Sequence, residues 1–318
     1  MFTKHASAMC TSSILFCLVL LTSCTKSPPA ITTAPAPTRT VVISPTVPPT
    51  PTASATPATT PTHYTARVLS SGRLRPDDLA FDAQGHLLFS DFYHGTVSRL
   101  NADGSVTVLV SGLAGPEGIV PLADGTMIIA EQRTNRILAL APGEKSPTVL
   151  RTLPGMPSTA PCKDGVDGIA LDAATNTLIV PDSPIGNVYR MSLDGTKLML
   201  LASGIVRPVG AAVDAQGTVY VADECGGAVV LISPAGKATR IGGFGMPDDV
   251  AFDKHGNLLV IDLQVSIHAL IRVSMSTGKH ETLASAGFIE PQGLVVDSKD
   301  DIYVSDDYAN KIVEFIPA

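Results

Sequence analysis

The stretch that decides the fold is a short motif that recurs along the chain. Its clearest copy reads Pro247-Asp248-Asp249-Val250-Ala251-Phe252-Asp253. The apolar run between a proline and a closing aspartate indicates a strand that begins at a loop and ends at a turn. Five more copies occur at 76–82, 116–120, 166–172, 208–214 and 291–297. The period is about forty residues, which lies in the range of β-propeller blades.

Two columns of aligned residues confirm the register of the repeats. The first column lies near the start of each motif and contains Asp77, Glu117, Asp167, Val209, Asp248 and Gln292. The second column lies 14 residues further on in five repeats and 15 in the third, and contains Asp91, Glu131, Asp182, Asp223, Asp262 and Asp306. Turn segments such as 254–257 separate the columns and suit a tight antiparallel connection. Each repeat is therefore predicted to be a small antiparallel meander.

Six such meanders can bury their apolar faces only against one another, around an axis. We therefore predict an all-β, six-bladed propeller of four-stranded antiparallel blades. The last repeat ends after its third strand, whereas segment 66–72 resembles segment 106–112, a fourth strand. The N-terminal strand is expected to complete the last blade. A composition of 27 Gly, 25 Pro and only 16% charged residues agrees with many turns and short strands.

The first sixty residues predict export and attachment to a membrane. Lys4 precedes an apolar run that is too short for a permanent span, and the run ends in Leu21-Thr22-Ser23-Cys24. This end resembles the lipobox of bacterial lipoproteins, which implies lipid on Cys24 and display outside the cytoplasm. The alternative is an ordinary secretory signal with a chance cysteine. The predicted domains are a signal peptide (1–23), a Pro/Thr-rich disordered stalk (24–63) and the propeller (64–318).

The charge distribution argues against nucleic acid as a partner. All 29 acidic residues follow His63, while three of the 22 basic residues precede it. The propeller therefore carries 19 basic against 29 acidic side chains, and such a surface repels polyphosphate. We expect a monomer that meets a small ligand or a protein at one face.

The repeats resemble the NHL type, most clearly in Ile302-Tyr303-Val304 and Asn310-Lys311-Ile312 of the last copy. They are also similar to the gluconolactonase-like propellers of the senescence-marker-protein type. The resemblance covers residues 65–318 and reports the fold more than the chemistry. A lyase like the streptogramin-opening propellers is a third possibility, but those resemble a seven-bladed ring and the chain has six repeats.

The first column is the candidate site, because all its members should ring the central channel. Four carboxylates, those of Asp77, Glu117, Asp167 and Asp248, converging on one axis would repel unless a cation or water relieves them. Oxygen ligands favour calcium or magnesium. The gluconolactonase resemblance implies a divalent ion at Asp77, Val209 and Asp248, and valine cannot bind one. A hydrated acidic channel without an ion is the alternative.

Other residues on the same face receive weaker predictions. The resemblance makes Asp248 the candidate catalytic residue of a lactonase, and His94, in the loop after Asp91, is a candidate base. Gln292, Asp78 and Asp249 are predicted to contact a ligand, although the two aspartates could instead cap loops. The second column is expected to be structural, with each acid accepting hydrogen bonds from the amides of the loop that follows it.

Two cysteines lie on the predicted site face. A longer connection before the third blade, 156–164, contains Cys162, and Cys225 follows the second column of the neighbouring blade. Outside the cell we expect them to form a disulfide that fixes the insertion over the channel, the alternative being two buried thiols. We favour a surface-displayed binding or sensing module over the second reading, a divalent-metal-dependent lactone or ester hydrolase.

Overall fold

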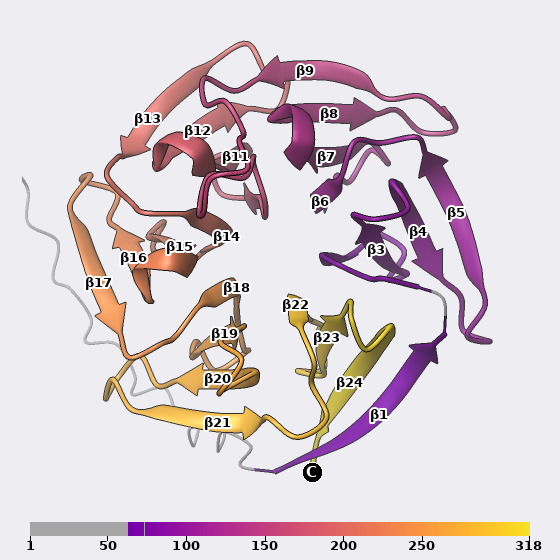
Figure 1. The fold of residues 1–318 in the computed structure, drawn as a ribbon, viewed down its shortest axis with the longest axis vertical. Coiled ribbons are helices and arrows are strands. Elements are labelled where there is room, and N and C mark those ends of the chain that lie inside the picture. Colours follow the sequence, from indigo (N-terminus) through magenta and orange to yellow (C-terminus); the bar gives the residue numbers. More distant parts are fainter. Residues whose placement is uncertain (1–62, 73) are drawn as a thin grey trace, which may run out of the picture. The chain divides into compact units, whose positions relative to one another are not determined.

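The computed structural model describes residues 63–72 and 74–318, which form a six-bladed β-propeller around a central channel (Figure 1). Blades one to three each contain four antiparallel strands in chain order. They are β2 (Leu79–Phe81), β3 (Leu87–Asp91), β4 (Thr96–Leu100) and β5 (Val106–Ser111); β6 (Pro116–Pro121), β7 (Met127–Glu131), β8 (Arg136–Leu140) and β9 (Thr148–Thr152); and β10 (Ala170–Asp172), β11 (Thr177–Asp182), β12 (Asn187–Ser192) and β13 (Leu198–Ala202).

Blades four to six repeat this plan, except that the sixth takes its outer strand from the start of the chain. The strands are β14 (Pro208–Val213), β15 (Val219–Asp223), β16 (Ala228–Ile232) and β17 (Ala238–Gly242); β18 (Pro247–Phe252), β19 (Leu258–Asp262), β20 (Ala269–Val273) and β21 (His280–Ala284); and β22 (Pro291–Val296), β23 (Ile302–Asp306), β24 (Lys311–Pro317) and β1 (Tyr64–Ser71). Three short 3-10 helices follow second strands: η1 (Gln132–Thr134), η2 (Ser183–Ile185) and η3 (Glu224–Gly226).

The ring closes as the sequence predicts. Strand β1 pairs antiparallel with β24, with Ala66 opposite Phe315, so residues from the two ends of the domain share one blade. An ion pair of 2.6 Å between Arg67 and Glu314 supports the same pairing. Because this closure removes two open sheet edges, it protects the domain from edge-to-edge association.

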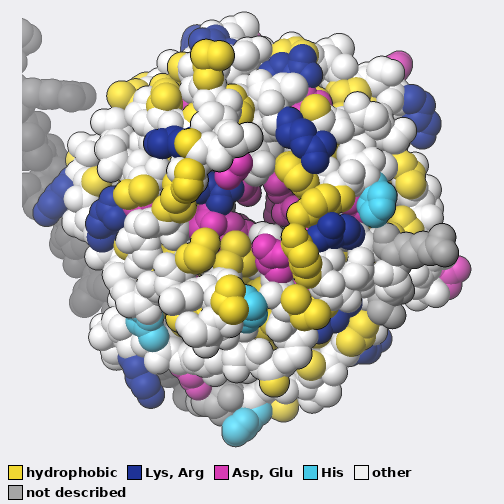
Figure 2. All heavy atoms as spheres, in the orientation of Figure 1, with side chains coloured by type: hydrophobic (Ala, Val, Ile, Leu, Met, Phe, Trp, Pro, Cys, Tyr) yellow, Lys and Arg dark blue, Asp and Glu magenta, His cyan; other side chains and the backbone are white. Residues whose placement is uncertain are grey.

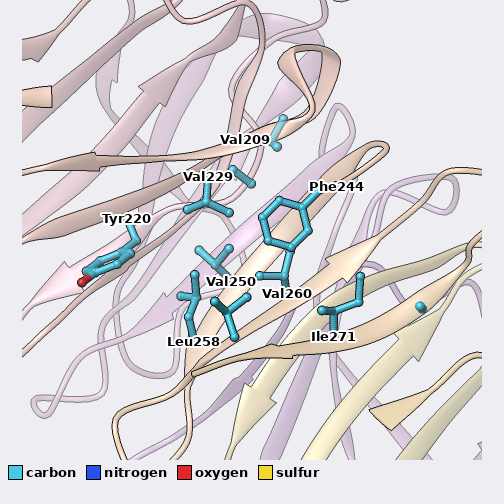
Figure 3. Packing of buried hydrophobic residues seen from close by; sticks show 11 residues of the cluster. Val209, Tyr220, Val229, Phe244, Val250, Leu258, Val260 and Ile271 are labelled. Atoms are coloured by element: carbon cyan, nitrogen blue, oxygen red, sulfur yellow. The ribbon is translucent and has the colours of Figure 1, made fainter. Parts of the chain in front are cut away.

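The core lies between neighbouring blades and not in the channel. Second strands such as β7 and β19 are buried along their whole length, whereas outer strands such as β5 are largely exposed or only partly covered. Figure 3 shows one interblade cluster, in which Val209 and Val229 of blade four face Phe244, Val250 and others at blade five. Each fully buried aliphatic side chain contributes about 1.5–3 kcal/mol, so these contacts fix the blades around the axis.

Strand register brings the two aligned columns to one face of the ring. In blade two Pro116 pairs with Glu131, and in blade five Pro247 pairs with Asp262. In five of the six blades the first-column residue follows a proline, and in blade three Asp167 follows Val166, so both columns lie at the end of the channel where first strands begin. Glycines allow the blades to meet there, since a Cβ on Gly210 would lie 2.5 Å from the Asp248 carbonyl oxygen.

The predicted signal peptide, Cys24 and the stalk lie outside the described residues. Within the part of the chain that the structure describes, no helix is both long and apolar enough to cross a bilayer.

Candidate acidic channel mouth

The four carboxylates of the first column meet in one cavity at the end of the channel. Asp77, Glu117, Asp167 and Asp248 line a hollow of about 280 Å³. Figure 2 shows Asp and Glu side chains gathered at this central opening. We call this cavity the acidic mouth; its other lining residues are Phe92, Tyr93, Gln132, Asp164, Arg207, Glu224, Leu263, Glu290, Gln292 and Asp307.

Arg207 is the only basic side chain among the described residues that line the mouth. Its Nη2 lies 3.1 Å from Asp167 Oδ2 and 3.6 Å from Asp164 Oδ2, and its Nη1 pairs with Glu224. Burial raises the pKa of Asp167, and the Arg207 charge opposes that rise. One guanidinium therefore forms ion pairs with carboxylates of the insertion, of blade three and of blade four, on what we call the blade-four side of the mouth.

In a second part of the mouth, the side-chain amide of Gln132 provides hydrogen bonds to neighbouring carboxylates. The side-chain amide of Gln132 donates to Glu117 Oε1 at 3.0 Å and to Asp167 Oδ2 at 3.1 Å. Burial raises the pKa of Glu117 well above its usual range, and the charge of Asp77 raises it further. A hydrogen bond between the two carboxyl groups lowers the pKa of Asp77, but burial outweighs it and the pKa is also raised. The pair therefore favours holding a proton between its two members.

Asp248 is one of the carboxylates of the mouth that receive no hydrogen bond from the described residues; Glu290 is another. Asp248 is only 7% exposed. Burial raises its pKa well above the usual range, the Asp167 charge adds to the rise, and Arg207 reduces it. Because a buried carboxylate without hydrogen bonds is costly, this side chain gains most from a proton or a bound cation.

Asp78 and Asp249 lie deeper in the channel, and their carboxylates already accept hydrogen bonds from backbone amides. Asp78 Oδ2 accepts the amide of Ile119 in the next blade at 2.8 Å, and Asp249 Oδ2 accepts that of Leu294 in the same way. Both line a void of about 10 Å³ below the mouth, together with Asp248 and other column residues. Burial raises the pKa of Asp78 to about 7. These two aspartates therefore join blades, a role that the ligand-contact prediction did not include.

The second column is bound to loop amides. Asp262 accepts the amides of Gly245 at 2.7 Å and Met246 at 2.9 Å, both in the loop before β18. The prediction named the following loop, and Asp262 also accepts from Gln264 there at 3.1 Å. His94 binds the same column, with Nδ1 at 2.7 Å from Asp91 Oδ2. More than half of its side chain is exposed, and it is not among the described residues that line the mouth.

The arrangement does not match a divalent-metal centre. Val209 is fully buried and packs against Phe244 and Val250 between blades four and five (Figure 3). Within residues 63–72 and 74–318, no three His, Cys, Asp or Glu side chains come close enough to hold one ion. Asp167 is engaged by Arg207, and Asp77 by Glu117. The calcium or magnesium prediction therefore stays a prediction, and the donor groups as arranged do not favour it.

The insertion before blade three is fixed beside the mouth by a disulfide. Cys162 and Cys225 are bonded, with Cα atoms 6.2 Å apart, as the sequence predicts. The amide of Gly155 donates to Asp182 Oδ2 at 2.9 Å, which anchors the other end of the insertion. Asp164 at its end lines the mouth and lies near Arg207.

A third column, one residue after each second-column acid, was missed from the sequence. It consists of Phe92, Gln132, Ser183, Glu224, Leu263 and Asp307, and all except Ser183 line the mouth. Burial, together with the neighbouring Glu290 charge, raises the pKa of Asp307 to about 7, against the influence of Arg75. The members share a position but no residue type, so alignment of the repeats was the one signal that could have revealed them.

No family model and no curated protein matches this chain. Solved structures with the same fold do exist. They include a gluconolactonase from Xanthomonas campestris (TM-score 0.66, 16% identity, 80% of this chain and 90% of that chain). A catalytically inactive virginiamycin B lyase from Staphylococcus aureus with quinupristin is similar at a TM-score of 0.61 (15% identity, 80% and 99%). A chain of a nidogen/laminin complex is similar at 0.60 (21% identity, 69% and 83%).

The lyase class that the repeat count disfavours is thus among the similar structures. These similar structures are a gluconolactonase, a lyase and a chain of a protein complex, so at these identities the likeness establishes the fold alone.

Proposed function

We propose that this protein is a surface-displayed binding module whose acidic mouth captures a positively charged group. The observation that carries this proposal is Asp248: a buried carboxylate, without a hydrogen bond from the described residues, at the wall of a solvent-reachable cavity. Functional sites are where such uncompensated polar groups concentrate.

The balance of charge in the mouth determines the sign of the ligand. Eight carboxyl groups and one guanidinium lie among its described lining residues. Arg207 neutralises the blade-four side, and Arg75 pairs with Asp307 and acts electrostatically on Glu290 at another part of the mouth. Asp77 and Asp248 have no ion pair with either cation among the described residues. A guest ammonium or guanidinium would there form charge-assisted hydrogen bonds, which are about twice as strong as neutral ones.

The size of the mouth limits the guest. Pockets for drug-sized ligands usually measure about 300–1,000 Å³, and the mouth measures about 280 Å³. A single alkylammonium or alkylguanidinium group therefore suits it better than a large molecule does.

A thermal-shift panel tests the proposal. n-Butylammonium and n-butylguanidinium are expected to raise Tm at pH 8, because a ligand that binds only the folded state stabilises it. Neutral n-butanol supplies the control for the alkyl chain, and CaCl₂ and MgCl₂ supply the divalent alternative. Asp248→Asn should abolish the shift, whereas Asp124→Asn, in an exposed turn at the other end of blade two, should retain it. A shift with calcium alone, or with none of the cations, would reject the proposal.

A lactone or ester hydrolase is the second candidate, since a gluconolactonase shares the fold. In that reading Asp248 would relay a proton beside a metal-bound carbonyl. A panel of lactones, assayed with added calcium or magnesium on the wild type and on Asp248→Asn, decides between the two. Turnover that disappears in the variant would favour the enzyme over the binding module.

Export and lipid attachment through Cys24 complete the proposal. They rest on the lipobox-like sequence before that cysteine. A Cys24→Ser variant should move the protein from the membrane fraction to the soluble extracytoplasmic fraction. A wild-type chain that fractionates as soluble would reject the anchor without affecting the binding proposal.

A further inference from the structure

The loops around the acidic mouth expose large apolar side chains, most of which do not line the cavity itself. They belong to five of the six blades and include Tyr93, Ile185, Val206, Met246, Ile289 and Tyr308. We call this set the apolar rim. Figure 2 shows hydrophobic side chains around the opening in which the acidic groups gather.

The rim is distinct from the rest of the exposed apolar surface. Most of the remaining exposed large apolar residues, such as Val108 and Val149, lie on outer strands of the blades. Contiguous exposed apolar surface bordering a polar centre marks interaction sites on soluble proteins. A small amine held within the mouth would leave this rim in water, whereas a protein segment would cover it.

We propose that the positively charged group arrives on another protein, in a loop with one Lys or Arg flanked by apolar residues. This inference rests on the proposed function and specifies its partner. The basic side chain enters the mouth toward Asp248, and its apolar neighbours rest on the rim. Exclusion of water by the surrounding apolar contacts strengthens the central ion pair, which is the usual anatomy of an interface hot spot.

Charge complementarity selects this occupant over other protein segments. Asp77, Asp248 and Glu290 line the mouth without an ion pair among the described residues, so an acidic or neutral side chain inserted beside them would add to the cost of burial. The apolar flanks follow from the rim, because polar flanks would lose water without gaining partners.

The rim is rigid before any partner binds. The Arg75 guanidinium lies 3.4 Å from the Tyr93 ring centroid and 4.4 Å from that of Tyr308, and it pairs with Asp307 at 3.2 Å. Across the mouth, the Cys162–Cys225 disulfide holds the insertion. Preorganised walls reduce the entropy lost on association, which favours a flat docking face over a closing pocket.

Selection of disulfide-cyclised random heptapeptides on the full-length protein tests this inference. We expect enriched peptides with one Lys or Arg between apolar residues, binding at least tenfold more tightly than n-butylammonium. Replacing the basic residue by norleucine should cost at least that factor.

Matched variants separate the two proposals. Val206→Ser together with Ile289→Ser should remove the peptide's advantage and leave n-butylammonium binding unchanged. Val108→Ser with Val149→Ser provides the control, because these valines are about as exposed (51% and 50%) as Val206 (46%). Enrichment of peptides without a basic residue, or no enrichment while the small cation binds, overturns the partner inference alone. If neither the peptides nor the small cations bind, the proposed function fails as well.

Discussion

Arg207 donates from Nη2 to Asp167 at 3.1 Å, and it comes from the one blade whose first-column residue, Val209, is apolar. Blade four, which has no polar side chain in the first column, thus supplies a cation from the position two residues earlier in the chain. This guanidinium also pairs with Glu224, so it neutralises carboxylates on one side of the mouth. It forms no ion pair with Asp248.

Removing that cation should destabilise the fold. Arg207→Met leaves the buried Glu224 and the partly buried Asp167 without their cation, although Asp167 keeps its hydrogen bond from Gln132. Breaking a buried ion pair in this way costs about 3–5 kcal/mol. Urea denaturation at pH 8 measures the loss, which should shrink at pH 5 because protonation removes the uncompensated charge. Adding Glu224→Gln should recover part of the stability. An Arg207→Met protein as stable as the wild type at pH 8 would show that the ion pairs of Arg207 contribute nothing to the free energy of unfolding.

The ligand-free protein should lose stability as the pH rises. The pKa values of Asp78 and Asp307 are raised to about 7 by burial, while unfolded carboxyls titrate near ~4. Between these limits the folded state binds more protons than the unfolded state, so the free energy of unfolding falls with increasing pH. Denaturant midpoints at pH 5, 6, 7 and 8 test the slope, which Asp307→Asn should flatten. A midpoint that increases across this range would contradict the account.

Cation binding should show the opposite dependence. A bound ammonium group needs the charged form of Asp248, whose pKa is raised by burial and by Asp167. Protons therefore compete with the ligand, and affinity should increase by up to about tenfold per pH unit for each proton displaced. Titrations with n-butylammonium between pH 5 and 8 measure this directly. Affinity independent of pH would mean that the guest does not meet a carboxylate from this set.

The aspartates that join blades should be structural. Asp78→Ala leaves the amides of Leu79 and Ile119 without their acceptor, and an unsatisfied buried donor costs about 1–3 kcal/mol. Denaturation should reveal this loss, while Asp124→Ala in an exposed turn should change stability little. Equal effects in the two variants would contradict the interblade role.

The disulfide should contribute to stability through the denatured chain. It links residues 63 positions apart, and removing such a bond costs roughly 2–4 kcal/mol. The double variant Cys162→Ser, Cys225→Ser should therefore unfold at a lower denaturant concentration. Addition of reductant should lower the wild type to the same midpoint and leave the variant unchanged; a wild type insensitive to reductant would exclude the bond.

The sequence predicted the ring because its repeats are constrained by geometry. The proline and acid positions recur at fixed spacing in most repeats, because the strand register pairs the proline with the acid in blades two, four, five and six, as Pro116 with Glu131. Closure by segment 66–72 followed from the missing fourth strand of the last repeat. The same periodicity identified Cys162 and Cys225 as neighbours.

The chemistry of the mouth could not be predicted in the same way. Gln132, Glu224 and Leu263 share a position but differ in type, because side chains that line a cavity are less constrained by packing than core side chains are. Conversely, Asp78 and Asp249 look like site residues in the sequence, yet they bind backbone amides of the next blade. Only the structure distinguishes a carboxylate that accepts backbone hydrogen bonds within the fold from one that has no hydrogen-bond donor.

Isothermal titration of n-butylammonium into the wild type and into Asp248→Asn at pH 8 tests the central claim most directly. The account predicts saturable one-to-one binding to the wild type that is lost in the variant, with both proteins folded by circular dichroism. Unchanged binding in Asp248→Asn would contradict it.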